Sequence, residues 1–216
     1  MKLFKKILLS SIVSSLAMAS GSMIEDSGTI ISQNCQITNF SQLNLKTIAD
    51  LKIKVGENLK CKIKADKNIV EVINFNVVDG ELIIDSSKSF STQSEIKITI
   101  STPSLKAIKS DGASEIKVSG LSEKNLKINL NGSGTLSGSG KVSNLNVKID
   151  GSVEVDLGSL KVKNAVVMVK GASELKLFVS DKLDATAYES SEINYIGNPK
   201  SVKKNVTGVA EINSND

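Results

Sequence analysis

The chain has 216 residues, a length that suits one domain of moderate size or two small ones. Hydrophobic residues make up 40% of it, aromatic residues only 3%, and Trp is absent, so the core must be built from Ile, Val, Leu and Ala. His is also absent, which excludes Ser–His and Cys–His nucleophilic pairs and histidine metal sites. Arg is absent as well, which disfavours nucleic acid as a partner, because bidentate recognition of phosphates and bases relies on Arg.

Residues 1–19 have the pattern of a cleaved secretory signal. Three lysines precede a mainly apolar run at residues 7–16, and Ala17 and Ala19 occupy the positions that a signal peptidase reads. The run is too short to span a bilayer, so we expect no transmembrane helix after cleavage; an uncleaved membrane anchor is the alternative. The mature chain then carries 24 Lys against 23 acidic residues, a net charge of +1. We expect an exported protein, in the periplasm, on the outer surface or outside the cell.

Residues 20–34 are small and polar without sustained periodicity, which is typical of a flexible lead. Cys35 and Cys61 are the only cysteines of the chain. Two thiols in an exported protein are often paired, but the sequence alone does not give their separation. A disulfide and two small buried hydrophobic residues therefore remain alternatives.

Residues 35–104 form the expected N-terminal β section. Apolar residues alternate with Lys at residues 51–55 and again at 59–63, and Gly56 marks a turn between the two runs, so a hairpin is predicted. Asp66 is a candidate N-cap for a short helical turn. Asp79-Gly80 is a second strong turn signal between strands.

From residue 105 a six-residue motif recurs, first as Asp111-Gly112-Ala113-Ser114-Glu115-Ile116, with its second residue at positions 112, 132, 151, 171, 189 and 208. A fixed period of this size is typical of stacked repeat architectures. The apolar residues of the motif form one column: Ile116, Leu136, Val155, Leu175, Ile193 and Ile212. We predict an all-β fold in which residues 105–216 are a parallel β-helix or β-solenoid with coils of 18–20 residues, preceded by the hairpin-rich section, with 35–216 as one continuous domain.

The segment Gly132-Ser133-Gly134-Thr135-Leu136-Ser137-Gly138-Ser139-Gly140 resembles the Gly-Ser-Gly repeat of the bacterial "putative auto-transporter adhesin, head GIN domain" family. Residues 79–84, 98–105 and 195–199 resemble other segments of that family in the same order. The resemblance covers residues 40–212 and implies an exported, non-enzymatic, β-helix-like protein of the cell envelope or surface. It favours a right-handed coil and supplies no catalytic or binding residues. The chain departs from the usual small residues of the repeat at Lys170, Glu189 and Val209.

The main candidate site is a ladder of carboxylates at one repeat position, interrupted only at Thr135: Glu115, Glu154, Glu174, Glu192 and Glu211. These residues alternate with the buried column, so they should point outward, about 4.8 Å apart on successive coils. Like charges at that spacing repel and need a counter-charge, either Lys117 and Lys176 or a bound cation such as Ca²⁺. A solvated face is the simpler interpretation, and a cation or ligand site is the functional one.

These patterns favour an exported, non-enzymatic interaction protein that binds a protein or glycan of the cell envelope or host surface. A secreted carbohydrate-active enzyme is the alternative, since Asp150, Glu154 and Asp156 could supply carboxylates, but long loops and aromatic sugar platforms are missing. A purely structural envelope component is the third interpretation. We expect no cofactor other than Ca²⁺. The strand edge near Ile212 predicts homo-association through that end unless the end is capped.

Overall fold

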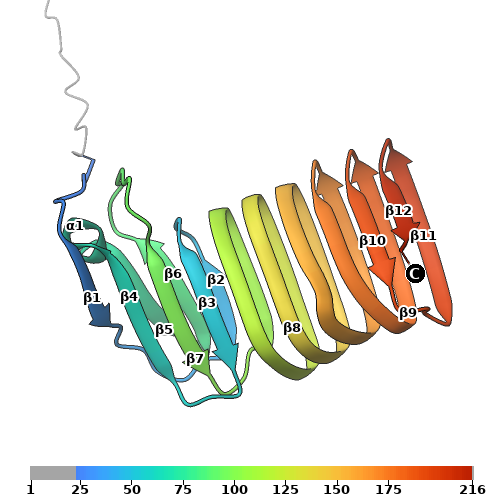
Figure 1. Ribbon diagram of the computed structural model, residues 1–216, viewed down its shortest axis with the longest axis horizontal. Helices are drawn as coiled ribbons and strands as arrows, with labels where there is room; N and C mark the ends of the chain where they lie inside the picture. Colours follow the sequence, from blue (N-terminus) through green and yellow to red (C-terminus); the bar gives the residue numbers. More distant parts are fainter. Residues whose placement is uncertain (1–22, 216) are drawn as a thin grey trace, which may run out of the picture.

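The structure, a computed structural model, describes residues 23–215 (Figure 1). The expected signal peptide at residues 1–19 lies outside these residues. Within residues 23–215 the chain is all-β, with twelve strands in one sheet and one short helix. The elements are β1 (Ile30–Asn34), β2 (Gln42–Leu45), β3 (Asp50–Val55), β4 (Lys60–Asp66), α1 (Lys67–Val70), β5 (Ile73–Val78), β6 (Glu81–Ser86), β7 (Lys97–Thr102), β8 (Ala107–Gly171), β9 (Glu174–Glu189), β10 (Glu192–Ile196), β11 (Ser201–Gly208) and β12 (Glu211–Ser214).

The predicted hairpin between β3 and β4 is wrong, because β7 lies between these two strands. β3 pairs in parallel with β7, and β4 pairs antiparallel with the other edge of β7, so Ile100 stands opposite both Ile53 and Cys61. The alternation of Lys and apolar residues correctly indicated two strands with one buried side. This pattern carried no information on which strand each of them joins, since β7 also alternates polar and apolar residues.

The second expected turn is confirmed. β5 and β6 form an antiparallel hairpin in which Val78 pairs with Glu81, so Asp79 and Gly80 make a two-residue turn. Both turn residues have positive φ, 50° for Asp79 and 76° for Gly80. This conformation is the reason that Asp-Gly is common in tight hairpins.

The expected helical turn is also present, and the segment before it is more ordered than the sequence indicated. α1 begins after its N-cap Asp66, whose side chain accepts a hydrogen bond from the backbone N–H of Asn68 at 2.9 Å. The flexible lead expected at residues 20–34 does not extend to residue 34, because Ile30–Asn34 form β1 and pair antiparallel with β4. Directly after β1, Cys35 forms a disulfide with Cys61 of β4.

From β8 onward, neighbouring strands run parallel at a nearly constant offset along the chain. Glu154 pairs with Glu174, Glu174 with Glu192, and Glu192 with Glu211, which are offsets of 20, 18 and 19 residues. Figure 1 shows the ribbon of β8 and β9 passing in successive turns along the long axis of the molecule. The motif period read from the sequence is therefore the spacing of paired strands.

The apolar column of the repeat is buried and extends into the N-terminal section. Leu51 of β3 stands between Ile98 of β7 and Ile116 of β8 in the strand registers. The column then continues through buried Leu136, Val155, Leu175, Ile193 and Ile212. These residues belong to one hydrophobic cluster that contains residues of both sections. Burying each large aliphatic side chain contributes roughly 1.5–3 kcal/mol, so the column is a main source of stability.

Candidate functional site

The predicted carboxylates form a row across neighbouring strands. Glu154, Glu174, Glu192 and Glu211 follow one another directly in the parallel registers. Glu115 instead pairs with Asp50 of β3. Sequence reasoning missed Asp50 because β3 precedes β8 by more than fifty residues and lies outside the repeat.

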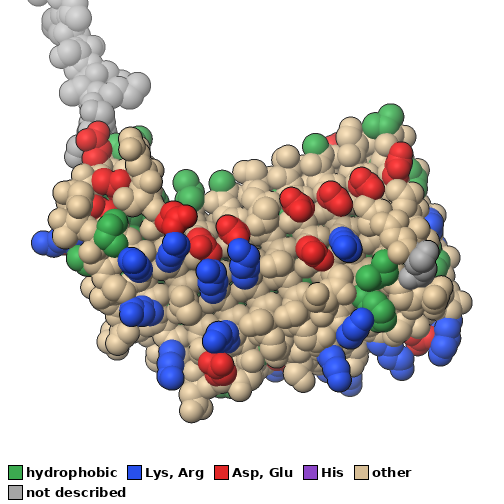
Figure 2. Space-filling view, in the orientation of Figure 1, with side chains coloured by type: hydrophobic (Ala, Val, Ile, Leu, Met, Phe, Trp, Pro, Cys, Tyr) green, Lys and Arg blue, Asp and Glu red, His purple; other side chains and the backbone are tan. Residues whose placement is uncertain are grey.

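The carboxylate row points outward, as the alternation predicted. Glu192 is partly buried and the other four glutamates are exposed, while the apolar residues that follow each of them are buried. Figure 2 shows acidic side chains in a row along one face of the molecule, with lysines beneath them toward the N-terminal half. From Glu154 to Glu211 the row is therefore an accessible charged strip, and Thr135 separates it from Glu115.

Short-range partners offset part of the charge in this row. Lys117 forms an ion pair with Glu115, and its side-chain hydrogen bond to Glu115, followed by the charge of the same carboxylate, raises the pKa of Lys117. The amide of Asn194 donates to Glu192 at 2.7 Å and to Glu174 at 3.5 Å. Lys176, the other expected counter-charge, forms no ion pair within residues 23–215.

The amide partners were not foreseen from the sequence. Asn194 occupies the position two residues after Glu192, and Asn213 stands in the same place after Glu211, to which it donates at 3.2 Å. Parallel pairing places both side chains in the row that also contains Asp156 and Lys176. The signal was present as a column of polar residues two positions after each glutamate.

No group of three or more Cys, Asp or Glu suited to a metal ion is found among the described residues. The carboxylates considered for catalysis have separate local roles. Asp150 lies 4.0 Å from the ammonium of Lys170, and Asp156 accepts a hydrogen bond from the backbone N–H of Gly158 at 2.9 Å. Neither contact has the arrangement of a general acid and a general base that act on a substrate.

A second polar row runs along the first residues of the motifs from Asp111 to Lys170 and ends at Glu189, the second residue of the next motif. Asn131 donates from its amide to Asp111 at 2.8 Å, and Lys170 lies between Asp150 at 4.0 Å and Glu189 at 3.6 Å. The departures from the family pattern at Lys170 and Glu189 therefore have a physical reason. A cation follows an anion along this row, and the charges on successive turns attract instead of repel.

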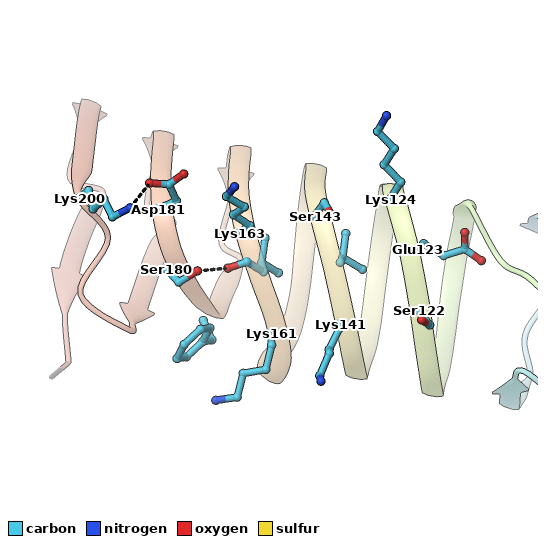
Figure 3. Close-up of a pocket in the computed structure, with 13 residues that line it drawn as sticks. Ser122, Glu123, Lys124, Lys141, Ser143, Lys161, Lys163, Ser180, Asp181 and Lys200 are labelled. Atoms are coloured by element: carbon cyan, nitrogen blue, oxygen red, sulfur yellow. Dashed lines mark hydrogen bonds and ion pairs between the residues drawn. The ribbon is translucent and has the colours of Figure 1, made fainter.

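A lysine-lined groove, which the sequence analysis did not identify, lies along another edge of the turns (Figure 3). Its volume is about 610 Å³. Lys124 and Lys163 point to one side of the ribbon, and Lys141 and Lys161 point to the other side. Residues from β8 and β9 and the connection between β10 and β11 line it.

Four polar contacts involve residues that line this groove. Lys200 pairs with Asp181 at 3.4 Å, and the ammonium of Lys161 lies 3.8 Å from the centre of the Phe178 ring. Glu123 accepts hydrogen bonds from the Ser104 hydroxyl at 2.7 Å and from a backbone N–H at 3.0 Å. Lys124, Lys141 and Lys163 form no ion pair within the part of the chain that the structure describes.

Parallel pairing at offsets of 18–20 residues, with charged rows on the outside, defines a repetitive all-β protein with a regular polar surface. The chain belongs to the family described as "Putative auto-transporter adhesin, head GIN domain", whose model matches residues 39–199. The resemblance noted from the Gly-Ser-Gly motif is thus confirmed. No curated protein matches the chain.

Several solved bacterial structures share the fold. A "putative adhesin" from Bacteroides fragilis is 20% identical with a TM-score of 0.71, covering 89% of this chain and 100% of that one. A "putative lipid binding protein" from Parabacteroides distasonis is 18% identical with a TM-score of 0.57, covering 90% and 100%. A "putative adhesin" from Parabacteroides merdae is 15% identical with a TM-score of 0.53, covering 90% and 99%.

None of the helices within residues 23–215 has the length and apolar character needed to cross a membrane.

Proposed function

We propose that this protein is an exported, non-enzymatic β-solenoid that binds a protein or glycan of the cell envelope or host surface. The solenoid interpretation rests on the offsets of 18–20 residues between parallel strands and on the buried column that they align. Successive coils would stack about 4.8 Å apart, and a right-handed coil follows the family resemblance. The signal pattern of residues 1–19 supports export.

The observation that carries the proposal is the lengthwise order of the polar rows. Backbone registers hold the glutamates from Glu154 to Glu211 in one line, so the backbone that carries them is already ordered before a partner binds. Preorganised, exposed and repeating groups suit an extended partner better than a small substrate, which is usually held in a concave pocket. Membership of a family described as adhesins agrees with this role.

A screen of the mature protein against immobilised glycans and extracellular matrix proteins tests the proposal. Saturable binding without chemical change of the ligand is the expected result. Release of shortened sugars would show the alternative, a carbohydrate-active enzyme. The absence of both binding and product would favour a purely structural envelope component.

The carboxylate row itself is tested by a neutralised variant, E154Q/E174Q/E211Q. If this row contacts the partner, the variant binds at least about tenfold more weakly than the natural chain in the same screen. A matched control is D79N, which changes one exposed turn carboxylate away from the row and keeps a residue that tolerates positive φ. Unchanged affinity of the triple variant would remove the row from the binding surface while leaving the general proposal intact.

A further inference from the structure

We propose that the lysine-lined groove binds a linear anionic polysaccharide that lies along the long axis of the molecule. The inference rests on the proposed interaction function and names a partner class for it. The groove presents five lysines, Lys124, Lys141, Lys161, Lys163 and Lys200, against two carboxylates. Its net charge of three positive charges exceeds the net charge of +1 on the whole mature chain, so positive charge is concentrated in the groove.

Backbone geometry spaces these lysines regularly. Side chains of Asn144 and Asn164 hydrogen-bond at 3.0 Å, which shows that residues 20 apart lie on adjacent turns in this region. Lys141 and Lys161 have the same separation, so their backbones lie about 4.8 Å apart. Ser143 lies on the turn between those of Lys124 and Lys163, so the backbones of these two lysines are separated by roughly twice the spacing of adjacent turns.

The arrangement places positive charge on both sides of a single track. Lys124 and Lys163 flank one side, and Lys141 and Lys161 flank the other (Figure 3). The buried side chains of Val142 and Val162 lie between them as the floor. A chain laid lengthwise would therefore meet an ammonium group on at least one flank at each of these three turns, and on both flanks at the turn of Lys161 and Lys163.

The chemistry of the lining favours a polysaccharide over other polyanions. Lys binds carboxylate or sulfate as a mobile point charge, whereas the planar Arg fork suited to nucleic acid is missing from the chain. Stacking platforms for bases are also lacking, because the ring of Phe178 is covered by Lys161 on one side and meets Gly197 closely. The hydroxyls of Ser122 and Ser143 make no hydrogen bond within residues 23–215 and can pair with sugar hydroxyls.

Binding measurements on the mature chain with defined probes test the inference. The probes are polygalacturonate, which carries carboxylates, dextran sulfate, which carries sulfates, uncharged dextran, and vesicles that contain anionic phospholipid. We expect binding to polygalacturonate or dextran sulfate, whichever anion the groove prefers, and none to uncharged dextran. Binding should weaken steeply with added salt because the contacts are exposed charges.

The decisive variant is K124S/K141S/K163S. Serine suits the fold there, since Ser143 already occupies the position between Lys124 and Lys163 on the intervening turn. We expect affinity for the charged polymer to fall about tenfold or more. The control is K62S/K64S/K148S, which removes the same charge from exposed lysines outside the groove and should change affinity less than about twofold.

Each contrary outcome overturns the inference. Equal losses of polymer affinity in the two triple variants would show that the polymer is attracted by the overall charge and not bound in the groove. Unchanged affinity of K124S/K141S/K163S would place the site elsewhere. Binding to vesicles but to neither charged polymer would indicate a membrane surface instead. If K124S/K141S/K163S has a lower Tm than the natural chain, K124Q/K163Q is measured in its place. The glutamines keep most of the aliphatic part of both lysine side chains. Failure with every polymer ends the groove proposal alone, because the glycan and matrix screen tests the interaction function independently.

Discussion

Asp66 is fully buried yet remains ionised because its carboxylate is saturated with donors. It accepts hydrogen bonds from the backbone N–H groups of Ser27, Thr29 and Asn68 and from the Ser27 hydroxyl. Burial alone would raise the pKa of Asp66, but these hydrogen bonds together lower it below its ordinary value. One side chain thus caps α1 and joins the segment before β1 to β4.

The lowered pKa of Asp66 predicts a defined loss of stability in acid. A carboxyl with a lower pKa in the folded state stabilises the fold above its unfolded pKa, which is about 3.9, and this contribution is lost as pH falls through the lower folded value. We expect Asp66→Asn to lower the Tm at pH 7 by several degrees, and the difference from the natural chain to shrink below about pH 4. Thermal unfolding from pH 2 to pH 8 measures it, with Asp79→Asn as a control that shows no such gap.

Gly151 has two separate requirements for glycine. Its φ is 132°, and an added Cβ would lie 2.1 Å from the carbonyl oxygen of Gly132 on the adjacent turn. We expect Gly151→Ala to cost on the order of 3 kcal/mol in free energy of unfolding, because backbone strain and a steric clash act together. Gly56→Ala isolates the strain, since φ there is 90° but no atom lies within 4 Å of the added Cβ. Equal costs in urea unfolding would contradict the contribution of the clash.

At the scale of the strands, charge order explains side chains that depart from the repeat. Lys170 lies 4.0 Å from Asp150, the first residue of the preceding motif, and 3.6 Å from Glu189, the second residue of the following motif. Without a cation there, two carboxylates would face each other across a single intervening turn. The departure from small residues therefore reflects the neighbours that the fold brings together.

Reversing this charge gives a prediction at the same scale. Lys170→Glu should lower the free energy of unfolding by about 1 kcal/mol, since two exposed attractions become repulsions. The effect should diminish in 1 M salt, where the Debye length is about 3 Å. Lys148→Glu is the matched control, because Lys148 forms no ion pair within the described residues. A cost that is independent of salt would indicate packing, not charge, as its origin.

The carboxylate row makes a prediction about calcium. Lys117, Asn194 and Asn213 already contact four of its five glutamates, and no metal-suited group is found among residues 23–215. We therefore expect millimolar Ca²⁺ to leave the Tm of the mature protein unchanged. A rise of several degrees that saturates with Ca²⁺ would instead show a specific cation site, because a ligand that binds only the folded state stabilises it.

At the scale of the whole molecule, the two rows and the groove all run along the long axis. The surface at the C-terminal end is of a different kind. Among the strands of residues 23–215, β11 pairs with β9 alone, and Lys204 of β11 stands in register with buried Ala185. Its ammonium donates to the carbonyl of Ile212 at 2.9 Å and lies 4.8 Å from the ring centre of Tyr195. A charge at a core position makes this end a poor surface for another copy to stack on.

Homo-association through this end stays a prediction, and Lys204 is the residue that limits it. We expect Lys204→Val to associate more strongly than the natural chain in sedimentation velocity, because Val202 and Val206 flank it and are already exposed. Lys203→Val is the control, since Lys203 pairs outward with Asp184 at 3.4 Å. If Lys204→Val sediments like the natural chain at every concentration, the end near Ile212 is not an association surface.

Local patterns in the sequence determined the all-β class, the buried column, the outward glutamates, the cap at Asp66 and the turn at Asp79-Gly80. Each follows from a period of two, a period of 18–20 residues, or the stereochemistry of one or two residues. Tertiary structure alone decided that β7 separates β3 from β4, that Asp50 faces Glu115, and that dispersed lysines line one groove. These features depend on which strands pair across long separations, and alternating patterns are too alike among strands to specify a partner.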